Sequence, residues 1–154
     1  MIKINVLQLE RQELDLAGTE GPAFLEIEDT ELVQFKDKVS YKLHVSLVNS
    51  GVLVAGSVKT AIHCICGRCV KEFTQPVENS SICRYYEDVT EPELDITEDI
   101  REEMLISIPI NYLCSEDCKG ICPHCGIDLN KKKCKCHEQK TGSDAWSVLD
   151  DLKL

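Results

Sequence analysis

The residues of this 154-residue chain most able to do chemistry are its ten cysteines, eight of which are closely spaced. C-x-x-C at Cys66 and Cys69 is followed by the run C-S-E-D-C-K-G-I-C-P-H-C-G from Cys114, and then by C-K-C from Cys134. Paired thiols at such spacings build tetrahedral zinc sites, because each short loop aims two sulfurs at one point. The glycine that ends C-P-H-C-G lets backbone amides turn back toward the sulfurs. The spacing therefore predicts bound zinc.

Eight cysteines suit two zinc ions with four ligands each. The arrangement that we favour has two sets: Cys66, Cys69, Cys114 and Cys118 in one, and Cys122, Cys125, Cys134 and Cys136 in the other. A second arrangement stays open, with Cys114, Cys118, Cys122 and Cys125 around one ion and the remaining four around the other. His137 could also replace Cys136 as a ligand. Cys64 and Cys83 are left over, and we expect both to be small core residues.

Other uses of the cysteines fit the sequence less well. A secreted disulfide framework would follow a signal peptide, but the N-terminal residues lack an apolar core of that length. A thioredoxin-like dithiol would begin a helix, whereas Cys66 and Cys69 lie between two strand-like runs. A thiol redox protein or redox sensor is also disfavoured, because every dithiol here has a matching partner pair.

The charge of the chain limits its partners. It carries 27 acidic and 17 basic side chains, a formal net charge of −10. Binding to nucleic acid draws its affinity from neutralising phosphates, so basic protein partners suit this chain better than a broad nucleic-acid surface. One basic cluster lies beside the last cysteines, at Lys131, Lys132, Lys133 and Lys135. These lysines either contact RNA phosphates or balance the negative charge of zinc held by thiolates.

The alternation of apolar and polar residues predicts antiparallel β-structure over the first two thirds of the chain. We expect extended segments at residues 2–6, 24–27, 41–47, 52–62, 73–77 and 82–86. A turn at residues 49–51 joins the two longest segments, and Gly56 marks a bulge in the second of them. The segment at 82–86 is the expected hairpin partner of the segment at 73–77.

One helix is expected near residues 96–107. Asp95 occupies the N-cap position, and Glu98 three residues later completes something close to a capping box. Ile100 and Met104 share one face of this helix, which would cover one face of the sheet.

The remaining segment cannot order itself by burying apolar side chains, because it has few of them. Residues 1–113 are therefore expected to form an antiparallel β domain, residues 114–140 a zinc-binding segment folded by its metal, and residues 141–154 a C-terminal helix. The predicted class is α+β: a mainly antiparallel β-sheet with one covering helix, a cysteine-rich zinc-binding C-terminal segment and a short terminal helix.

The sequence carries no sign of catalysis or of a membrane. It contains no nucleophile elbow, phosphate-binding loop or carboxylate pair, and none of His63, His124 and His137 has a visible acidic partner for catalysis. No apolar run approaches the roughly 20 residues that span a bilayer. We therefore expect a protein that is not an enzyme, with no small-molecule substrate and no membrane partner.

The two cysteine-bearing runs resemble the signatures of the YceD family, the large ribosomal RNA subunit accumulation proteins. The first run is G-S-V-K-T-A-I-H-C-I-C-G-R-C-V-K-E-F-T-Q-P-V, and the second is I-P-I-N-Y-L-C-S-E-D-C-K-G-I-C-P-H-C-G-I-D-L-N, followed by C-K-C. The resemblance extends over nearly the whole chain. One departure is Ser143-Asp144-Ala145-Trp146, which stands where such proteins commonly have D-P-R. The missing arginine weakens the case for an RNA contact by the terminal helix.

This resemblance implies a cytoplasmic protein that supports the accumulation or processing of large-subunit ribosomal RNA, or ribosome assembly. Its partners would be ribosomal RNA or large-subunit ribosomal proteins. The alternative is a zinc-stabilised adaptor between proteins that does not bind RNA.

Overall fold

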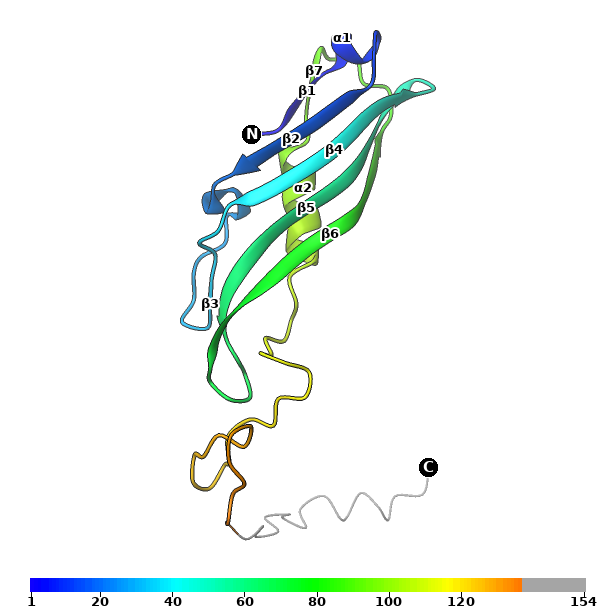
Figure 1. Ribbon diagram of the computed structural model, residues 1–154. Helices are drawn as coiled ribbons and strands as arrows, with labels where there is room; N and C mark the ends of the chain where they lie inside the picture. Colours follow the sequence, from blue (N-terminus) through cyan, green and yellow to red (C-terminus); the bar gives the residue numbers. More distant parts are fainter. Residues whose placement is uncertain (137–154) are drawn as a thin grey trace, which may run out of the picture.

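The computed structural model describes residues 1–136 and consists mainly of antiparallel β-structure with few helices (Figure 1). The C-terminal helix expected at 141–154, the last residues of the zinc-binding segment and His137 lie outside the described residues. The strands are β1 (Lys3–Asn5), β2 (Leu14–Glu20), β3 (Val33–Gln34), β4 (Val39–Val48), β5 (Gly51–Ile65), β6 (Glu72–Tyr86) and β7 (Glu93–Asp95). The helices are α1 (Val6–Leu9), the 3-10 helix η1 (Pro22–Leu25) and α2 (Thr97–Ile106).

Strand β5 is the centre of a five-stranded antiparallel sheet. One of its edges pairs first with β4 and then with the short β3, while β6 pairs along the other edge. Strand β2 extends the sheet beyond β4, and β1 pairs with β7 in a separate two-stranded sheet. The β5–β6 hairpin carries its connecting loop, residues 66–71, to one end of the sheet, the lower end in Figure 1.

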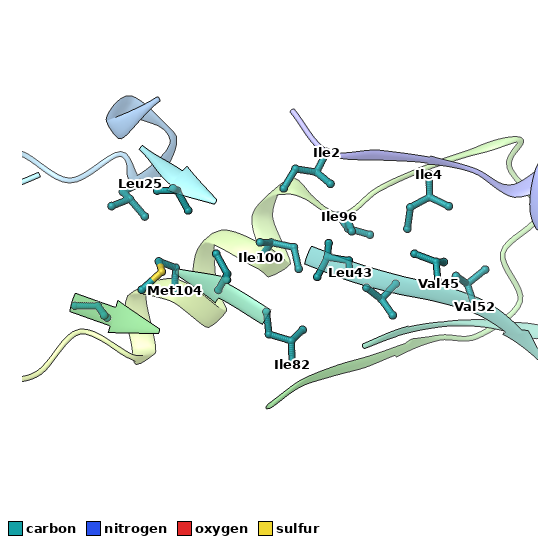
Figure 2. Packing of buried hydrophobic residues seen from close by; sticks show 14 of the residues in the cluster. Ile2, Ile4, Leu25, Leu43, Val45, Val52, Ile82, Ile96, Ile100 and Met104 are labelled. Carbon is teal, nitrogen blue, oxygen red and sulfur yellow. The ribbon is translucent and has the colours of Figure 1, made fainter. Parts of the chain in front are cut away.

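Helix α2 packs on one face of this sheet, as expected from its apolar stripe. Ile100 and Met104 are fully buried in the core beneath the sheet, and Figure 2 shows Ile100 beside Leu43 of β4. Alternate residues of the strands point toward the helix because strand side chains have a period of two. The turn at Asn49–Gly51 and the irregularity after Gly56 also lie where the sequence places them.

Several local predictions were wrong. Residues 82–86 are not the hairpin partner of residues 73–77, because both belong to the continuous strand β6, which pairs with β5 along its whole length. Residues 24–27 are not extended, since η1 begins at Pro22, whose ring fixes a helical φ. Strand β2 was not expected, and residue 6 begins α1 rather than continuing β1.

Two single residues also differ from expectation. Cys83 is exposed rather than in the core, because Ile82 takes the inward position and Cys83 faces the opposite side of β6. The N-cap of α2 is Ile96, one residue later than expected. Asp95 still supports this end of the helix, because its carboxylate accepts hydrogen bonds from the backbone N–H and the hydroxyl of Thr97.

A polar contact fastens α2 to β6 and gives a first testable expectation. The hydroxyl of Tyr86 donates a hydrogen bond to Asp99 at 2.6 Å, and burial together with this bond raises the pKa of Tyr86 above the usual 10.0. The substitution Tyr86→Phe should lower the free energy of unfolding by about 1 kcal/mol at pH 7, measured by urea denaturation. Above the pKa of the unfolded phenol, Tyr86 ionises in the unfolded chain before it ionises in the fold, so the wild type loses stability as the pH rises. The difference in the free energy of unfolding between the wild type and Tyr86→Phe should therefore narrow in alkaline solution.

Tyr85→Phe is the matched control, because Tyr85 points to the other face and donates to the carbonyl oxygen of Val48 at an exposed position. It should change the free energy of unfolding less. Equal losses in the two variants would contradict a specific role for the contact between Tyr86 and Asp99.

Candidate metal centre

Two segments distant in sequence bring the first four cysteines together. Cys66 and Cys69 lie in the β5–β6 loop, and Cys114 and Cys118 lie in the chain that returns from α2. The four sulfurs lie within 4.8 Å of one another, with Cys66 and Cys118 at 3.8 Å and Cys69 and Cys114 at 3.6 Å. We call this group the first cluster. It joins the end of the sheet to the described chain at residues 114–136, which we call the C-terminal segment.

The second cluster lies within the C-terminal segment and contains Cys122, Cys125, Cys134 and Cys136, again within 4.8 Å of one another. The sulfur of Cys134 is 3.3 Å from that of Cys122 and 3.5 Å from that of Cys125. The two clusters contain the sets of four that we favoured from the spacing. The open alternative, which divides the eight cysteines differently, has no counterpart in residues 1–136.

The geometry of both clusters fits a tetrahedral ion. Four sulfurs about 2.3 Å from a central zinc would be about 3.8 Å from one another. The sulfur contacts given above, between 3.3 and 3.8 Å, lie close to this value, and all ten cysteines are free thiols. The chemistry of the donor set agrees, since four thiolates favour a soft or borderline-soft ion. Each cluster could therefore hold a metal ion.

The two C-x-x-C loops have the same backbone turn. The N–H of Val70 donates to the carbonyl of Cys66, and the N–H of Gly126 donates to that of Cys122, both at 2.9 Å. Both residues have positive φ, 59° at Val70 and 72° at Gly126. Glycine adopts this conformation easily, whereas a β-branched valine is strained in it. The first loop therefore keeps a costly turn in order to aim its amides and sulfurs.

The turns also prepare one thiol in each cluster to bind a cation. Burial alone would raise the pKa of Cys66, but backbone N–H groups of Cys114, Cys69 and Arg68 donate toward its sulfur and lower the pKa to about 6. Backbone N–H groups of its own loop likewise lower the pKa of Cys122 to about 6. Hydrogen bonds to the charged form favour that form, so these two thiols ionise readily at neutral pH.

Other thiols in the clusters resist ionisation. The pKa of Cys114 is raised to about 12, first by its hydrogen bond with Cys69, and that of Cys136 is raised to about 12, first by its hydrogen bond with Cys134. Crowded thiolates repel one another, so four of them can ionise together only when a cation lies between them. The donor sets are therefore suited to a metal ion and poorly suited to remain as free thiolates.

Further contacts tie the C-terminal segment to the β5–β6 loop. The guanidinium of Arg68 donates hydrogen bonds to the carbonyls of Glu116 and Cys118, at 3.2 and 3.0 Å. The N–H of Gly67 donates to the backbone carbonyl of Tyr112, and the N–H of Ile121 donates to the backbone carbonyl of Arg68. Arg68 was not among the residues predicted from the sequence, because these acceptors are backbone carbonyls and leave no mark in the sequence.

Side chains expected near the metal are placed as follows. Lys131, Lys132, Lys133 and Lys135 are exposed around the second cluster, and Lys131 forms an ion pair with Asp128 at 3.7 Å. Two histidines have acidic neighbours that the sequence did not reveal. His63 hydrogen-bonds Asp37 and Thr74, and His44 contacts Asp15, in each case across neighbouring strands or loops that only the fold brings together.

Comparisons with known proteins identify the region that carries the second cluster. Residues 84–153 match the family described as Large ribosomal RNA subunit accumulation protein YceD. Residues 84–153 of this chain are thus similar to the YceD family. The chain is also 42% identical over 48 residues to the chloroplastic YCED homolog 1 of Arabidopsis thaliana, whose name contains the same description, and this alignment covers 31% of the chain and 15% of that protein.

More distant similarity covers a longer part of this chain. Uncharacterized proteins of Mycobacterium bovis and Mycobacterium tuberculosis are each 28% identical over 112 residues, which cover 63% of this chain and 54% of theirs. The alignments thus span about half or less of these relatives. No solved structure matches the chain. No described helix has the length and apolar character needed to cross a bilayer.

Proposed function

We propose that this chain is a YceD-family protein, a zinc-binding, non-enzymatic factor that supports large-subunit ribosomal RNA accumulation or processing, or ribosome assembly, in the cytoplasm. The observation that carries the proposal is the pair of four-cysteine clusters. Six of their eight cysteines lie within residues 84–153, which match a family described by ribosomal RNA accumulation. The second cluster has three of its four thiols at partly or fully exposed positions, and it presents lysines around them.

Zinc has a structural role in this proposal. A four-thiolate site has no open coordination position for water or substrate, which is the feature that separates structural from catalytic zinc. The side-chain amide of Asn130 adds a hydrogen bond to the sulfur of Cys118. The metal would thus hold a binding surface in place.

We assign the RNA contact to Lys131, Lys132 and Lys133, because they are consecutive, exposed and directly precede Cys134 of the second cluster. The net charge of −10 makes electrostatic attraction to phosphate unfavourable elsewhere, so the contact would be local and of modest affinity. Lys135 would contribute to the same surface.

One observation favours the adaptor as the second candidate. Ile106, at the end of α2, is 76% exposed, and Ile110, beyond it, is 94% exposed. Large apolar side chains that are exposed close to one another often mark a surface that binds a partner. A protein partner that buries them would explain their position without any RNA contact.

Changing Lys131, Lys132 and Lys133 to glutamine tests the assignment. If they contact phosphates, RNA recovered with the tagged full chain from cell extract should decrease, and the salt dependence of RNA binding should fall by roughly one unit of slope per lost contact. Zinc content should stay the same. The control changes Lys38, Lys42 and Lys59 to glutamine. These lysines are also exposed and lie on or beside the sheet, and their substitution removes the same amount of positive charge.

The outcome separates the candidates. Ribosomal RNA that is recovered equally with both triple variants would place the RNA contact elsewhere. Recovery of ribosomal or other proteins without RNA would favour the adaptor. Faster loss of zinc to a chelator, with unchanged RNA binding, would show that the three lysines compensate the thiolate charge.

A further inference from the structure

Asn130 is held in a defined position by the loop of the second cluster. It lies between Cys125 and Cys134, and its backbone N–H and its side-chain amide both donate to the same carboxylate oxygen of Asp128, at 2.9 Å. The N–H of Leu129 also donates to the carbonyl of Gly120 at 2.9 Å, which fixes the loop against the chain that enters it. These contacts fix the direction in which the side chain of Asn130 points.

From this position Asn130 reaches the first cluster. Its amide nitrogen is 3.5 Å from the sulfur of Cys118, and its side-chain oxygen accepts a hydrogen bond from the backbone N–H of Lys119 at 2.8 Å. A backbone N–H can only donate, so the oxygen of the amide must face Lys119 and the NH₂ group must face the sulfur. The direction of the N–H···S contact is thus set by a second, independent contact.

The contact matters because Cys118 is 3% exposed. Water has little access to its sulfur, so protein N–H groups must stabilise the thiolate that a metal requires. Hydrogen bonds from outside the ligand set orient metal ligands and tune their affinity. Asn130 is a residue of the second cluster's loop that acts on a ligand of the first cluster.

We propose that Asn130 couples the two metal centres, so that zinc in the second cluster slows the loss of zinc from the first. This inference rests on the zinc binding proposed above. Without metal, the loop between Cys125 and Cys134 loses the ion that closes it, and Asn130 is no longer presented to Cys118. The coupling is reciprocal, as any coupling between two binding equilibria must be. Asn130 is a positioning residue and not a ligand.

A double-mutant cycle on the full chain tests the coupling. The four proteins are the wild type, Asn130→Ala, Cys134→Ser with Cys136→Ser, and the combination of all three changes. Release of zinc from the first cluster to a chromogenic chelator is followed in each, and the rate for this cluster is assigned from the variant that lacks the second. Cadmium-113 NMR of the substituted protein gives a second readout, because each cluster gives its own signal.

We expect Asn130→Ala to speed zinc release from the first cluster by about tenfold, the lower end of the effect seen when a partner of a metal ligand is removed. Disabling the second cluster should have a similar effect in the wild type and little further effect in Asn130→Ala. The cadmium signal of the first cluster should shift in Asn130→Ala. Asn5→Ala is the matched control, because Asn5 is exposed and makes no capping hydrogen bond, and it should change neither readout.

The possible failures are distinguishable. Two zinc ions per chain with fully additive effects in the cycle would overturn the coupling and leave the zinc proposal intact. A wild-type chain without bound metal would overturn both. Circular dichroism of the sheet in all variants guards against general unfolding, and Asn130→Asp supplies a second test, because it keeps the size of the side chain but replaces the N–H donor with a negative charge beside the thiolate. It should release zinc at least as fast as Asn130→Ala.

Discussion

Replacing Cys66 and Cys69 by serine is expected to reduce the bound zinc from two ions per chain to one and to detach the C-terminal segment from the sheet. The sheet itself should survive, because its buried core runs from Ile2 to Met104 and includes none of the eight clustered cysteines. The C-terminal segment has little apolar burial of its own, and structural zinc contributes about 10–16 kcal/mol to the folding of small zinc-binding units. Loss of the first centre therefore removes the main connection between the two parts.

Elemental analysis and hydrogen exchange measure this result. The amides of Gly67 and Ile121, which hydrogen-bond across the junction, should lose protection, while the amide of Cys122, bonded to Ile127 inside the second loop, should keep most of it. The double substitution Cys134→Ser with Cys136→Ser should give the opposite pattern, with protection lost at the amide of Cys122 and mostly kept at those of Gly67 and Ile121.

Cys83→Ser is the control for cysteine loss, because Cys83 is exposed and belongs to neither cluster. It should retain two zinc ions and normal exchange. Two ions in the Cys66 and Cys69 variant would exclude the first cluster as a zinc centre. Identical exchange patterns in the two double variants would contradict the division into two centres.

Gly56→Ala is expected to destabilise the sheet by about 3 kcal/mol, a large loss for one methyl group. Gly56 has a φ of +157°, and a Cβ atom there would lie 2.1 Å from the carbonyl oxygen of Lys42 and 2.8 Å from the Cα of Leu43. These are backbone atoms of β4, so no side-chain rotation can relieve the overlap. The two strands would have to separate at the bulge, next to the fully buried Val54 and Val58.

Urea denaturation followed by circular dichroism gives the change in the free energy of unfolding. Gly21→Ala is the matched control, because a Cβ there meets nothing within 4 Å and the φ of −68° suits alanine. It should be neutral, or more stable by about 0.4–1 kcal/mol, because alanine reduces the entropy of the unfolded chain. Equal stability of the two variants would mean that β4 and β5 do not approach as closely at Gly56 as the structure shows.

The sequence alone was sufficient wherever the information was local. Cys122 and Cys125 are three residues apart and must aim at one point, and the Gly after them permits the turn that aims them. Alternation along β4 and β5 marks their buried faces, and the spacing of Ile100 and Met104 marks the face of α2. Each of these features depends on neighbours within a turn or two of the chain, so periodicity and spacing are enough to predict them.

Only the tertiary structure decided which distant segments meet. The hairpin expected between residues 73–77 and 82–86 does not form, because β5 offers β6 a continuous partner strand and a bulge takes up the irregularity. The inward position of Ile82 then sets Cys83 outward.

The same holds at the metal centres. The pairs of cysteines are local features, but the contact of Asn130 with Cys118 joins residues twelve positions apart through the path of a folded loop. Spacing along the chain left two ways of grouping the sulfurs, and only the folded chain chooses between them. The hydrogen bonds that tune those sulfurs likewise depend on backbone groups and side chains whose direction is fixed only when the whole segment has folded.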